Sequence, residues 1–220
     1  MKKKKAIIFG TGTLAELVNF YLEIDSPYEV AAFCSTSPEI DTFCKKPLIC
    51  FLEVERKFPP NEYELFVAVG YRKMNDLRKS FCEEARKKGY KLLSYISSRT
   101  TFWNKENTIG DNVFIFENNN IQPFVEIEDG VILWSGNHIG HHSKIGAYSF
   151  LTSHVVISGF CTIGQQCFLG VNSTVADNLS LGNKALVGAG ALVIKSLLDN
   201  QVILGQKGTP INKTSDYFLR

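Results

Sequence analysis

An aliphatic residue recurs at every sixth position through the second half of this chain, and this period constrains the fold more than any other feature. The uninterrupted series comprises Ile109, Ile115, Ile121, Ile127, Leu133, Ile139, Ile145, Leu151, Ile157, Ile163, Leu169, Val175, Leu181, Val187 and Val193. Glycine often follows the aliphatic residue, and the fifth position of most six-residue units, or hexads, is small or apolar. Neither an α-helix nor an ordinary alternating strand produces this pattern. It predicts a short strand and a tight turn in every hexad.

Three hexads per coil would close a triangular prism, a parallel β-helix. Residues eighteen positions apart then stack as parallel strands about 4.8 Å apart. One interior column is expected to contain Ile109, Ile127, Ile145, Ile163 and Leu181. Asn119 and Asn137 are also eighteen apart and point inward, so we expect them to share an amide ladder. Cys161 and Cys167 fall on inward positions, which favours a structural role for both thiols.

The composition is that of an ordinary globular protein. Of 220 residues, 45% are hydrophobic and 21% are charged, and the formal net charge is +2, so no nucleic-acid partner is expected. The apolar segment after Lys2–Lys5 is too short for a signal peptide, and no stretch approaches the ~20 apolar residues of a membrane span. The six cysteines form no Cys-x-x-Cys pair and are interpreted as reduced thiols of a cytoplasmic protein.

The first part of the chain alternates between strand and helix patterns. The expected elements are strands at Ala6–Phe9, Glu29–Cys34, Leu65–Val69 and Leu92–Ile96, and helices at Leu14–Ile24 and Met74–Lys88. Such alternation predicts a small Rossmann-like parallel sheet that binds ligands at the carboxyl ends of its strands. We therefore expect an α/β domain over residues 1–98, followed by a β-helix domain with a C-terminal tail over residues 99–220.

A glycine-rich turn follows the first strand. Gly10-Thr11-Gly12-Thr13-Leu14-Ala15 opens a helix, and its backbone N–H groups suit a phosphate. The acidic residue that would hold the ribose of NAD is absent after the second strand, where Cys34-Ser35-Thr36 stands. The basic residues of Gly70-Tyr71-Arg72-Lys73 follow another strand and could reach a diphosphate. The alternative interpretation is a tight turn and solvated charges.

The hexads and the preceding α/β segment together resemble the hexapeptide-repeat sugar acetyltransferases, which include the bacillosamine-pathway N-acetyltransferase and the sialic acid O-acetyltransferases. The resemblance implies a left-handed β-helix, a homotrimer, and acetyl-CoA as acyl donor. It also implies that Gly10, Gly12 and Thr13 contact phosphate of a nucleotide-linked sugar, together with Arg72 and Lys73. Donor contacts map to Gly159, Gly170, Asn172, Gly188, Ala189 and Gly190. The alternative interpretation is that these glycines serve only the turns of the coils.

All four histidines of the chain lie between His138 and His154. Histidine can take and return a proton near neutral pH, as attack of an amine on a thioester requires. The resemblance implies that His141 is the catalytic base. His142 stands where the family has a glutamate that orients the base, so either His142 or a carboxylate of a neighbouring subunit does this work. His154 either binds substrate or is a surface histidine.

His138 is expected to lie at a corner of its coil and to be structural. A zinc site formed by His138, His141 and His142 is an alternative, but no acidic or cysteine residue has a matching spacing, and no metal is expected.

The predicted function is transfer of an acetyl group from acetyl-CoA to the amine of a nucleotide-linked amino-deoxy sugar, by direct attack on the thioester. Such a reaction serves the synthesis of lipopolysaccharide, another surface polysaccharide, or a glycan. One alternative is O-acetylation of a sugar hydroxyl. Another is a β-helix that is not an acyltransferase, either an assembly subunit or a metal protein like the γ-class carbonic anhydrases.

Overall fold

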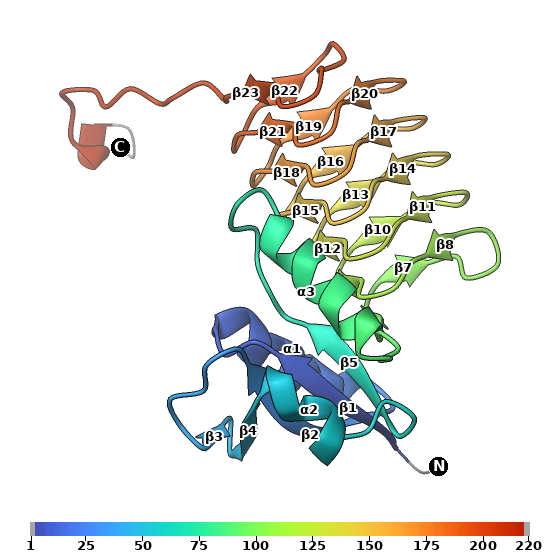
Figure 1. Cartoon of the computed structure of the whole chain (residues 1–220). Coiled ribbons are helices and arrows are strands. Elements are labelled where there is room, and N and C mark those ends of the chain that lie inside the picture. Colours follow the sequence, from blue (N-terminus) through green and yellow to red (C-terminus); the bar gives the residue numbers. More distant parts are fainter. Residues whose placement is uncertain (1–2, 218–220) are drawn as a thin grey trace.

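The computed structural model describes residues 3–217, and it contains an α/β region followed by a long column of coils (Figure 1). The α/β region comprises β1 (Lys4–Phe9), α1 (Thr13–Asp25), β2 (Tyr28–Ser35), β3 (Thr42–Phe43), β4 (Lys46–Cys50), a 3-10 turn (Phe51–Glu53), α2 (Val54–Lys57), β5 (Tyr63–Val67) and α3 (Asp76–Lys87). The strand order is β3-β4-β2-β1-β5. All pairs are parallel except the β3–β4 hairpin. The predicted parallel sheet is therefore present.

Most predicted elements of this region are confirmed, but one is wrong. Leu92–Ile96 is not a strand of this sheet, because Leu92 makes only an isolated bridge to Leu65. Tyr95–Ile96 instead forms β6, which pairs in parallel with β9 (Phe114–Ile115) of the β-helix. β5 also ends two residues earlier than predicted, at Val67. The short elements between β2 and β5 were not predicted, since each is too short to show a clear period.

The coils contribute strands to three parallel faces, which we name by the number of strands in the described residues. The seven-stranded face contains β6 (Tyr95–Ile96), β9 (Phe114–Ile115), β12 (Ile132–Leu133), β15 (Phe150–Leu151), β18 (Phe168–Leu169), β21 (Leu186–Val187) and β23 (Val202–Ile203). The six-stranded face contains β7 (Thr101–Phe102), β10 (Asn120–Ile121), β13 (His138–Ile139), β16 (Val156–Ile157), β19 (Thr174–Val175) and β22 (Leu192–Val193). The five-stranded face contains β8 (Thr108–Ile109), β11 (Glu126–Ile127), β14 (Lys144–Ile145), β17 (Thr162–Ile163) and β20 (Ser180–Leu181).

Three columns of turns form the vertices of the prism. The histidine vertex joins the six-stranded to the five-stranded face, the α3 vertex joins the five-stranded to the seven-stranded face, and the glycine vertex joins the seven-stranded to the six-stranded face. In the middle coils these turns are residues 140–143, 146–149 and 152–155 respectively. Many short parallel strands in three faces fit the predicted left-handed β-helix. A 3-10 turn at Ser215–Tyr217 lies beyond the last coil.

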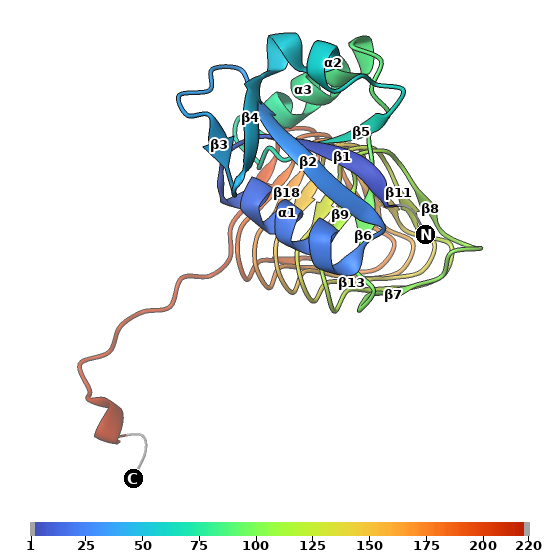
Figure 2. The ribbon, with the colours of Figure 1, turned by 90° about the horizontal axis from the view of Figure 1, so that it is seen from below.

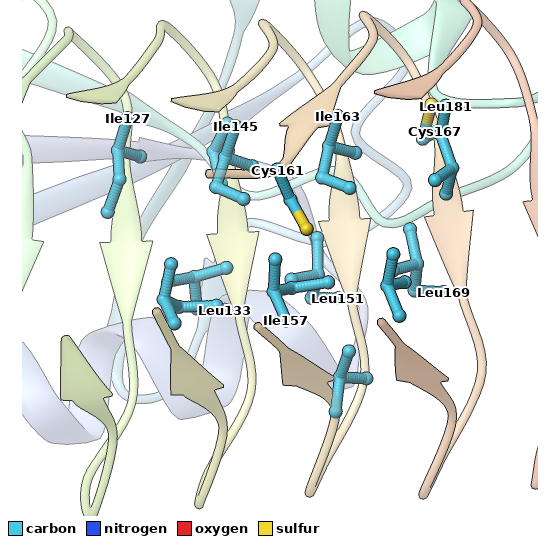
Figure 3. Packing of buried hydrophobic residues seen from close by; sticks show 14 of the residues in the cluster. Ile127, Leu133, Ile145, Leu151, Ile157, Cys161, Ile163, Cys167, Leu169 and Leu181 are labelled. Atoms are coloured by element: carbon cyan, nitrogen blue, oxygen red, sulfur yellow. The ribbon is translucent and has the colours of Figure 1, made fainter. Parts of the chain in front are cut away.

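The predicted interior column is confirmed. Ile127 lies opposite Ile109 and Ile145 in adjacent coils, and the column continues through Ile163 to Leu181. Cys161 and Cys167 are buried in the same core and carry free thiols (Figure 3). The six-residue period therefore marks the one inward aliphatic residue of each strand, and these residues stack from coil to coil into a continuous hydrophobic core.

The two inward asparagines bind the main chain rather than each other, so the predicted amide ladder is wrong in detail. The Oδ1 atom of Asn119 accepts a hydrogen bond from the backbone N–H of Asn137, at 3.1 Å. In the same way, Oδ1 of Asn137 accepts from the N–H of Val155 at 2.7 Å. Both residues are almost fully buried. Each amide therefore satisfies a backbone group of the next coil, as a buried polar group must.

One residue in most turns has a left-handed backbone conformation, which is uncommon outside glycine. Two of the candidate histidines are among them, with φ values of 56° at His142 and 59° at His154. The turns tolerate this conformation because their backbone groups bond to the coil beside them, as the N–H of His154 does to Ser135 O at 3.1 Å. The repeat thus determines the backbone conformation of these two histidines.

The α/β region covers the earlier strands of the seven-stranded face, from β6 to β18, whereas Val202 of β23 is exposed (Figure 2). The outward residues of that face, which include Phe114, Ile132 and Phe150, are buried against α1 and the sheet. The Tyr21 ring of α1 packs edge-on against Phe116, with centroids 5.2 Å apart. Among the described residues 3–217, the α/β region covers neither the histidine vertex nor the outer surface of the six-stranded face.

Candidate active site

His141 and His142 lie in the turn between β13 and β14, at the histidine vertex, and both are exposed. Their Nδ1 atoms are 3.1 Å apart. One of these two nitrogens must carry a proton for the contact to be a hydrogen bond. The backbone N–H of His141 donates to Oε1 of Gln122 in the preceding coil, at 2.9 Å. The pair is therefore held by its own side chains and by the coil stacking.

Two phenylalanines enclose the His142 ring. Phe124, His142 and Phe160 are eighteen residues apart, so the repeat stacks them at one vertex. The His142 ring lies 4.7 Å from Phe124 and 4.9 Å from Phe160, and it is nearly parallel to Phe160. The Phe160 ring also meets His141 edge-on at 5.0 Å. These contacts restrict the rotation of both imidazoles. The eighteen-residue spacing of these three aromatic residues is the sequence signal for this arrangement.

Gly159 lies directly against the His141 ring. A Cβ atom added at Gly159 would lie 2.9 Å from Cε1 of His141. The glycine therefore makes room for the imidazole, which is a different role from the donor contact that the resemblance implied.

The other two histidines do not join this pair. His138 lies within β13 and is half-buried on the outer surface of the six-stranded face, so its expected place at a corner is wrong. His154 is exposed in a turn of the glycine vertex, where its ring covers Gly136. Among residues 3–217, no group of three or more His, Cys, Asp or Glu side chains could hold a metal ion. This geometry gives the alternative of a zinc site formed by His138, His141 and His142 no support.

A pocket of about 410 Å³ lies between the α/β region and the seven-stranded face. Its walls are the Gly12-Thr13-Leu14 turn, residues 68–72, and the rings of Trp134 and Phe150. Three of the predicted substrate-binding residues, Gly12, Thr13 and Arg72, therefore meet in one cavity. Gly12 precedes the first residue of α1, so the helix N-terminus opens toward the pocket.

Gly10 and Lys73 lie next to this pocket without lining it. Gly10 has φ +126°, and an added Cβ atom would lie 2.8 Å from the carbonyl oxygen of Ala68. Glycine is thus required there for the sharp turn after β1. Lys73 is exposed and has a left-handed backbone, with φ 53°.

The sequence analysis did not predict the two aromatic rings, Trp134 and Phe150, that the β-helix adds to the pocket wall. Phe150 belongs to a longer column. Phe114, Ile132, Phe150 and Phe168 stack in register on the outside of the seven-stranded face. An outward position of a β-helix that faces water should be polar. An apolar column at outward positions was therefore the signal that another part of the chain covers this face.

Five of the residues expected to bind the donor lie in turns of the glycine vertex. These are Gly170 and Asn172, between β18 and β19, and Gly188, Ala189 and Gly190, between β21 and β22. An added Cβ atom at Gly170 would lie 2.5 Å from the backbone nitrogen of Ala189, so coil stacking alone requires glycine there. Around Gly190, by contrast, an added Cβ atom meets nothing within 4 Å. The structure gathers these residues, but at a different vertex from His141.

No protein-family model matches the chain, and no curated protein sequence is significantly similar to it. Solved structures do match. PerB from Caulobacter crescentus, in complex with CoA and GDP-perosamine, superposes with a TM-score of 0.82 at 26% identity, over 91% of this chain and 94% of that chain. The resemblance to the hexapeptide-repeat sugar acetyltransferases is thereby confirmed.

Two further structures extend the comparison. The H141N variant of perosamine N-acetyltransferase from Caulobacter crescentus, in complex with CoA and GDP-perosamine, matches with a TM-score of 0.83 at 25% identity, over 91% of this chain and 93% of that chain. The acetyltransferase domain of PglB from Neisseria gonorrhoeae matches with a TM-score of 0.82 at 21% identity, over 95% of this chain and all 100% of that domain. At this identity the second match supports the fold alone. In the part of the chain that the model describes, no helix is long and apolar enough to cross a membrane.

Proposed function

We propose that this chain is an N-acetyltransferase that moves an acetyl group from acetyl-CoA to the amine of a nucleotide-linked amino-deoxy sugar. The observation that carries the proposal is the match over nearly the whole chain to an enzyme structure holding CoA and GDP-perosamine. The exposed imidazole pair and the pocket beside a helix N-terminus suit the two halves of this reaction. The product would serve the synthesis of a surface polysaccharide or glycan.

In the proposed mechanism, His141 is the general base. When the Nδ1–H group of His141 donates a hydrogen bond to Nδ1 of His142, Nε2 of the neutral His141 ring carries no proton and is free to accept one. The sugar amine attacks the thioester carbonyl carbon, and its N–H proton passes to Nε2 of His141. The C–S bond then breaks, and the sulfur leaves as a thiol once the imidazolium returns the proton. His142 takes the orienting role because it occupies the position of the family's glutamate.

The nucleotide end of the substrate is assigned to residues 1–98, acting as a Rossmann-like domain in front of the β-helix of residues 99–220. The backbone of Gly12 and Thr13 would hold a phosphate at the start of α1, with Gly10 shaping the turn. Arg72 and Lys73 would add positive charge to the diphosphate site. His154 is a candidate contact to the sugar, since it belongs to the vertex next to Trp134 in the pocket wall.

The pocket and His141 belong to different sides of one chain. The pocket opens beside the seven-stranded face, and the histidine vertex is the one that does not border this face. Along the prism axis, however, the two are at the same level. The pocket is lined by Trp134 and Phe150, which flank the coil that carries His141. A single chain therefore presents both halves of a site without joining them.

We propose that a homotrimer completes the site. A rotation about an axis parallel to the prism leaves every residue at its own height, so His141 of one copy can face the pocket of the next. The donor would lie in the groove between two prisms, along Gly170, Asn172 and the turn Gly188-Ala189-Gly190. Six free cysteines favour a reducing compartment, and we propose the cytoplasm.

The test is CoA release from acetyl-CoA with a panel of UDP-, dTDP- and GDP-linked amino sugars. We expect release with one member of the panel, and a loss of at least about a hundredfold in kcat for His141→Ala. His138→Ala serves as the matched control, because it removes a histidine from the same coil outside the proposed site. The same nucleotide sugars with a hydroxyl group in place of the amine are assayed beside the panel, and release with one of these alone would replace the proposal with O-acetylation. No release with any sugar would refute it.

A further inference from the structure

Arg78 of α3 is fully buried, and its hydrogen bonds go to main-chain carbonyl groups on two different elements. Toward the β-helix, Nε donates to Gly130 O at 2.8 Å and Nη2 donates to Tyr148 O at 2.6 Å. Toward the α/β region, Nη1 donates to Val69 O at 3.2 Å and to Gly70 O at 2.9 Å. The guanidinium thus joins two turns of the α3 vertex to the segment that follows β5.

That segment, residues 69–75, is here called the pocket loop because it supplies Gly70, Tyr71 and Arg72 to the pocket wall. The second half of the pocket loop has an unusual backbone. Three consecutive residues, Lys73, Met74 and Asn75, have φ values of 53°, 49° and 67°. The left-handed region is unfavourable for residues other than glycine, and such a run persists only where surrounding contacts hold it.

The β-helix supplies those contacts at the end of the loop. Asn75 is fully buried, and its Nδ2 atom donates to Gln166 O at 3.1 Å and to Cys167 O at 3.3 Å. In return, Nε2 of Gln166 donates to Met74 O at 3.2 Å. Both ends of the pocket loop are therefore bound to the α3 vertex, one through Arg78 and the other through Asn75.

We infer that Arg78 and Asn75 are positioning residues for the binding of a nucleoside diphosphate. This inference rests on the proposed function. Between them, the two side chains hold the loop that presents Arg72 and the backbone of Gly70 and Tyr71 to the pocket. Neither side chain touches the pocket itself. Arg78 also places a buried positive charge behind the loop that would face the diphosphate, and this charge would favour its binding.

Two substitutions separate positioning from mere stability. Asn75→Gly removes both amide hydrogen bonds and keeps a residue that adopts φ +67° without strain. Arg78→Lys keeps the positive charge but lacks the planar guanidinium group that donates to the β-helix turns and to the pocket loop at the same time. In each variant we expect the Kd for the preferred nucleoside diphosphate among UDP, dTDP and GDP to rise by at least about tenfold. The KM for the nucleotide sugar should rise in parallel, while the KM for acetyl-CoA changes less than about twofold.

Lys184→Ala is the matched control. Lys184 lies on the same α3 vertex and pairs with Asp76 at 3.1 Å, beyond the end of the pocket loop. This variant should bind the nucleotide with unchanged affinity. If Arg78→Lys does not fold, Asn75→Gly still decides the question, with circular dichroism and thermal unfolding as checks of its fold.

A folded Asn75→Gly protein with wild-type nucleotide affinity would overturn the inference. So would a wild-type protein that binds neither a nucleoside diphosphate nor inorganic pyrophosphate in calorimetry. A wild-type protein that binds a nucleoside diphosphate but acetylates no sugar contradicts the proposed function alone, because the loop is then still tested by binding.

Discussion

The Nδ1 atoms of His141 and His142 face each other at 3.1 Å, so the two imidazoles act as a hydrogen-bonded pair. A carboxylate in the position of His142 would hold the imidazole and also stabilise the imidazolium formed when the base takes a proton. A neutral imidazole can only do the first, since it carries no compensating charge. Under the proposed mechanism, His142 would therefore orient the base through geometry rather than through charge.

Replacing His142 tests this interpretation directly. We expect His142→Ala to lower kcat by about 10- to 100-fold, because His141 loses the group that fixes its tautomer. His142→Glu should recover most of the loss, since a carboxylate can accept the same Nδ1–H. Steady-state kinetics with saturating acetyl-CoA provides the measurement. An Ala variant with wild-type kcat would mean that another group orients His141.

The ring of Phe160 is expected to matter for rate more than for stability. It is 55% exposed, so its truncation costs little buried apolar area. It nevertheless contacts both imidazoles, at 5.0 Å from His141 and 4.9 Å from His142. We expect Phe160→Ala to lower kcat about tenfold, as loss of orientation does, with a nearly unchanged midpoint of thermal unfolding. Leu52→Ala, which truncates an exposed apolar residue in the α/β region, should change neither quantity. Equal rates for Phe160→Ala and the natural protein would remove Phe160 from the site.

The two glycines of the first turn should respond differently to alanine. At Gly10 the new Cβ atom would lie 2.8 Å from Ala68 O at a φ of +126°, whereas at Gly12 it meets nothing within 4 Å. We therefore expect Gly10→Ala to lower the free energy of unfolding by about 1–3 kcal/mol. Gly12→Ala should leave stability unchanged and weaken nucleotide binding, because its methyl group would enter the pocket. Chemical denaturation and calorimetry measure the two effects, and identical behaviour of the two variants would refute the distinction.

Asp25 should make the protein sensitive to acid. Burial alone would raise the pKa of this carboxyl group, but hydrogen bonds from Ser98, Tyr95 and Ser97 outweigh burial and lower it. A carboxyl group whose pKa is lowered by folding stabilises the protein above its unfolded pKa of about 3.9. That stabilisation is lost as the pH falls through the lower, folded value.

The comparison that isolates this effect is Asp25→Asn. The asparagine variant should be less stable than the natural protein at neutral pH, and the difference should shrink as the pH falls below about 3.9. Urea denaturation across this range measures both stabilities. A difference that does not depend on pH would show that the carboxylate contributes no linked stabilisation.

Sequence patterns correctly predicted the strands, turns and helices whose hydrophobic period lies within a short segment of the chain. The hexad period identified the coils, because each strand and its turn lie within six residues. The strand and helix periods identified β1, α1, β2 and α3. They failed at Leu92–Ile96, where two neighbouring segments of one apolar run join different sheets. A local pattern says that a segment is apolar, but it does not say which sheet the segment will join.

The sequence by itself determined the β-helix, the stacking of residues eighteen positions apart, and the glycine-rich turn at Gly10–Thr13 that precedes a helix. The first two follow from the six-residue period, and the turn follows from glycines that stand between an apolar strand and a segment with helical apolar spacing. Only the tertiary structure decided that the α/β region covers the earlier strands of the seven-stranded face. That choice depends on which apolar surfaces bury one another, and it creates the pocket at Trp134 and Phe150, away from His141. The buried fork of Arg78 likewise depends on groups distant in sequence, which no spacing rule relates.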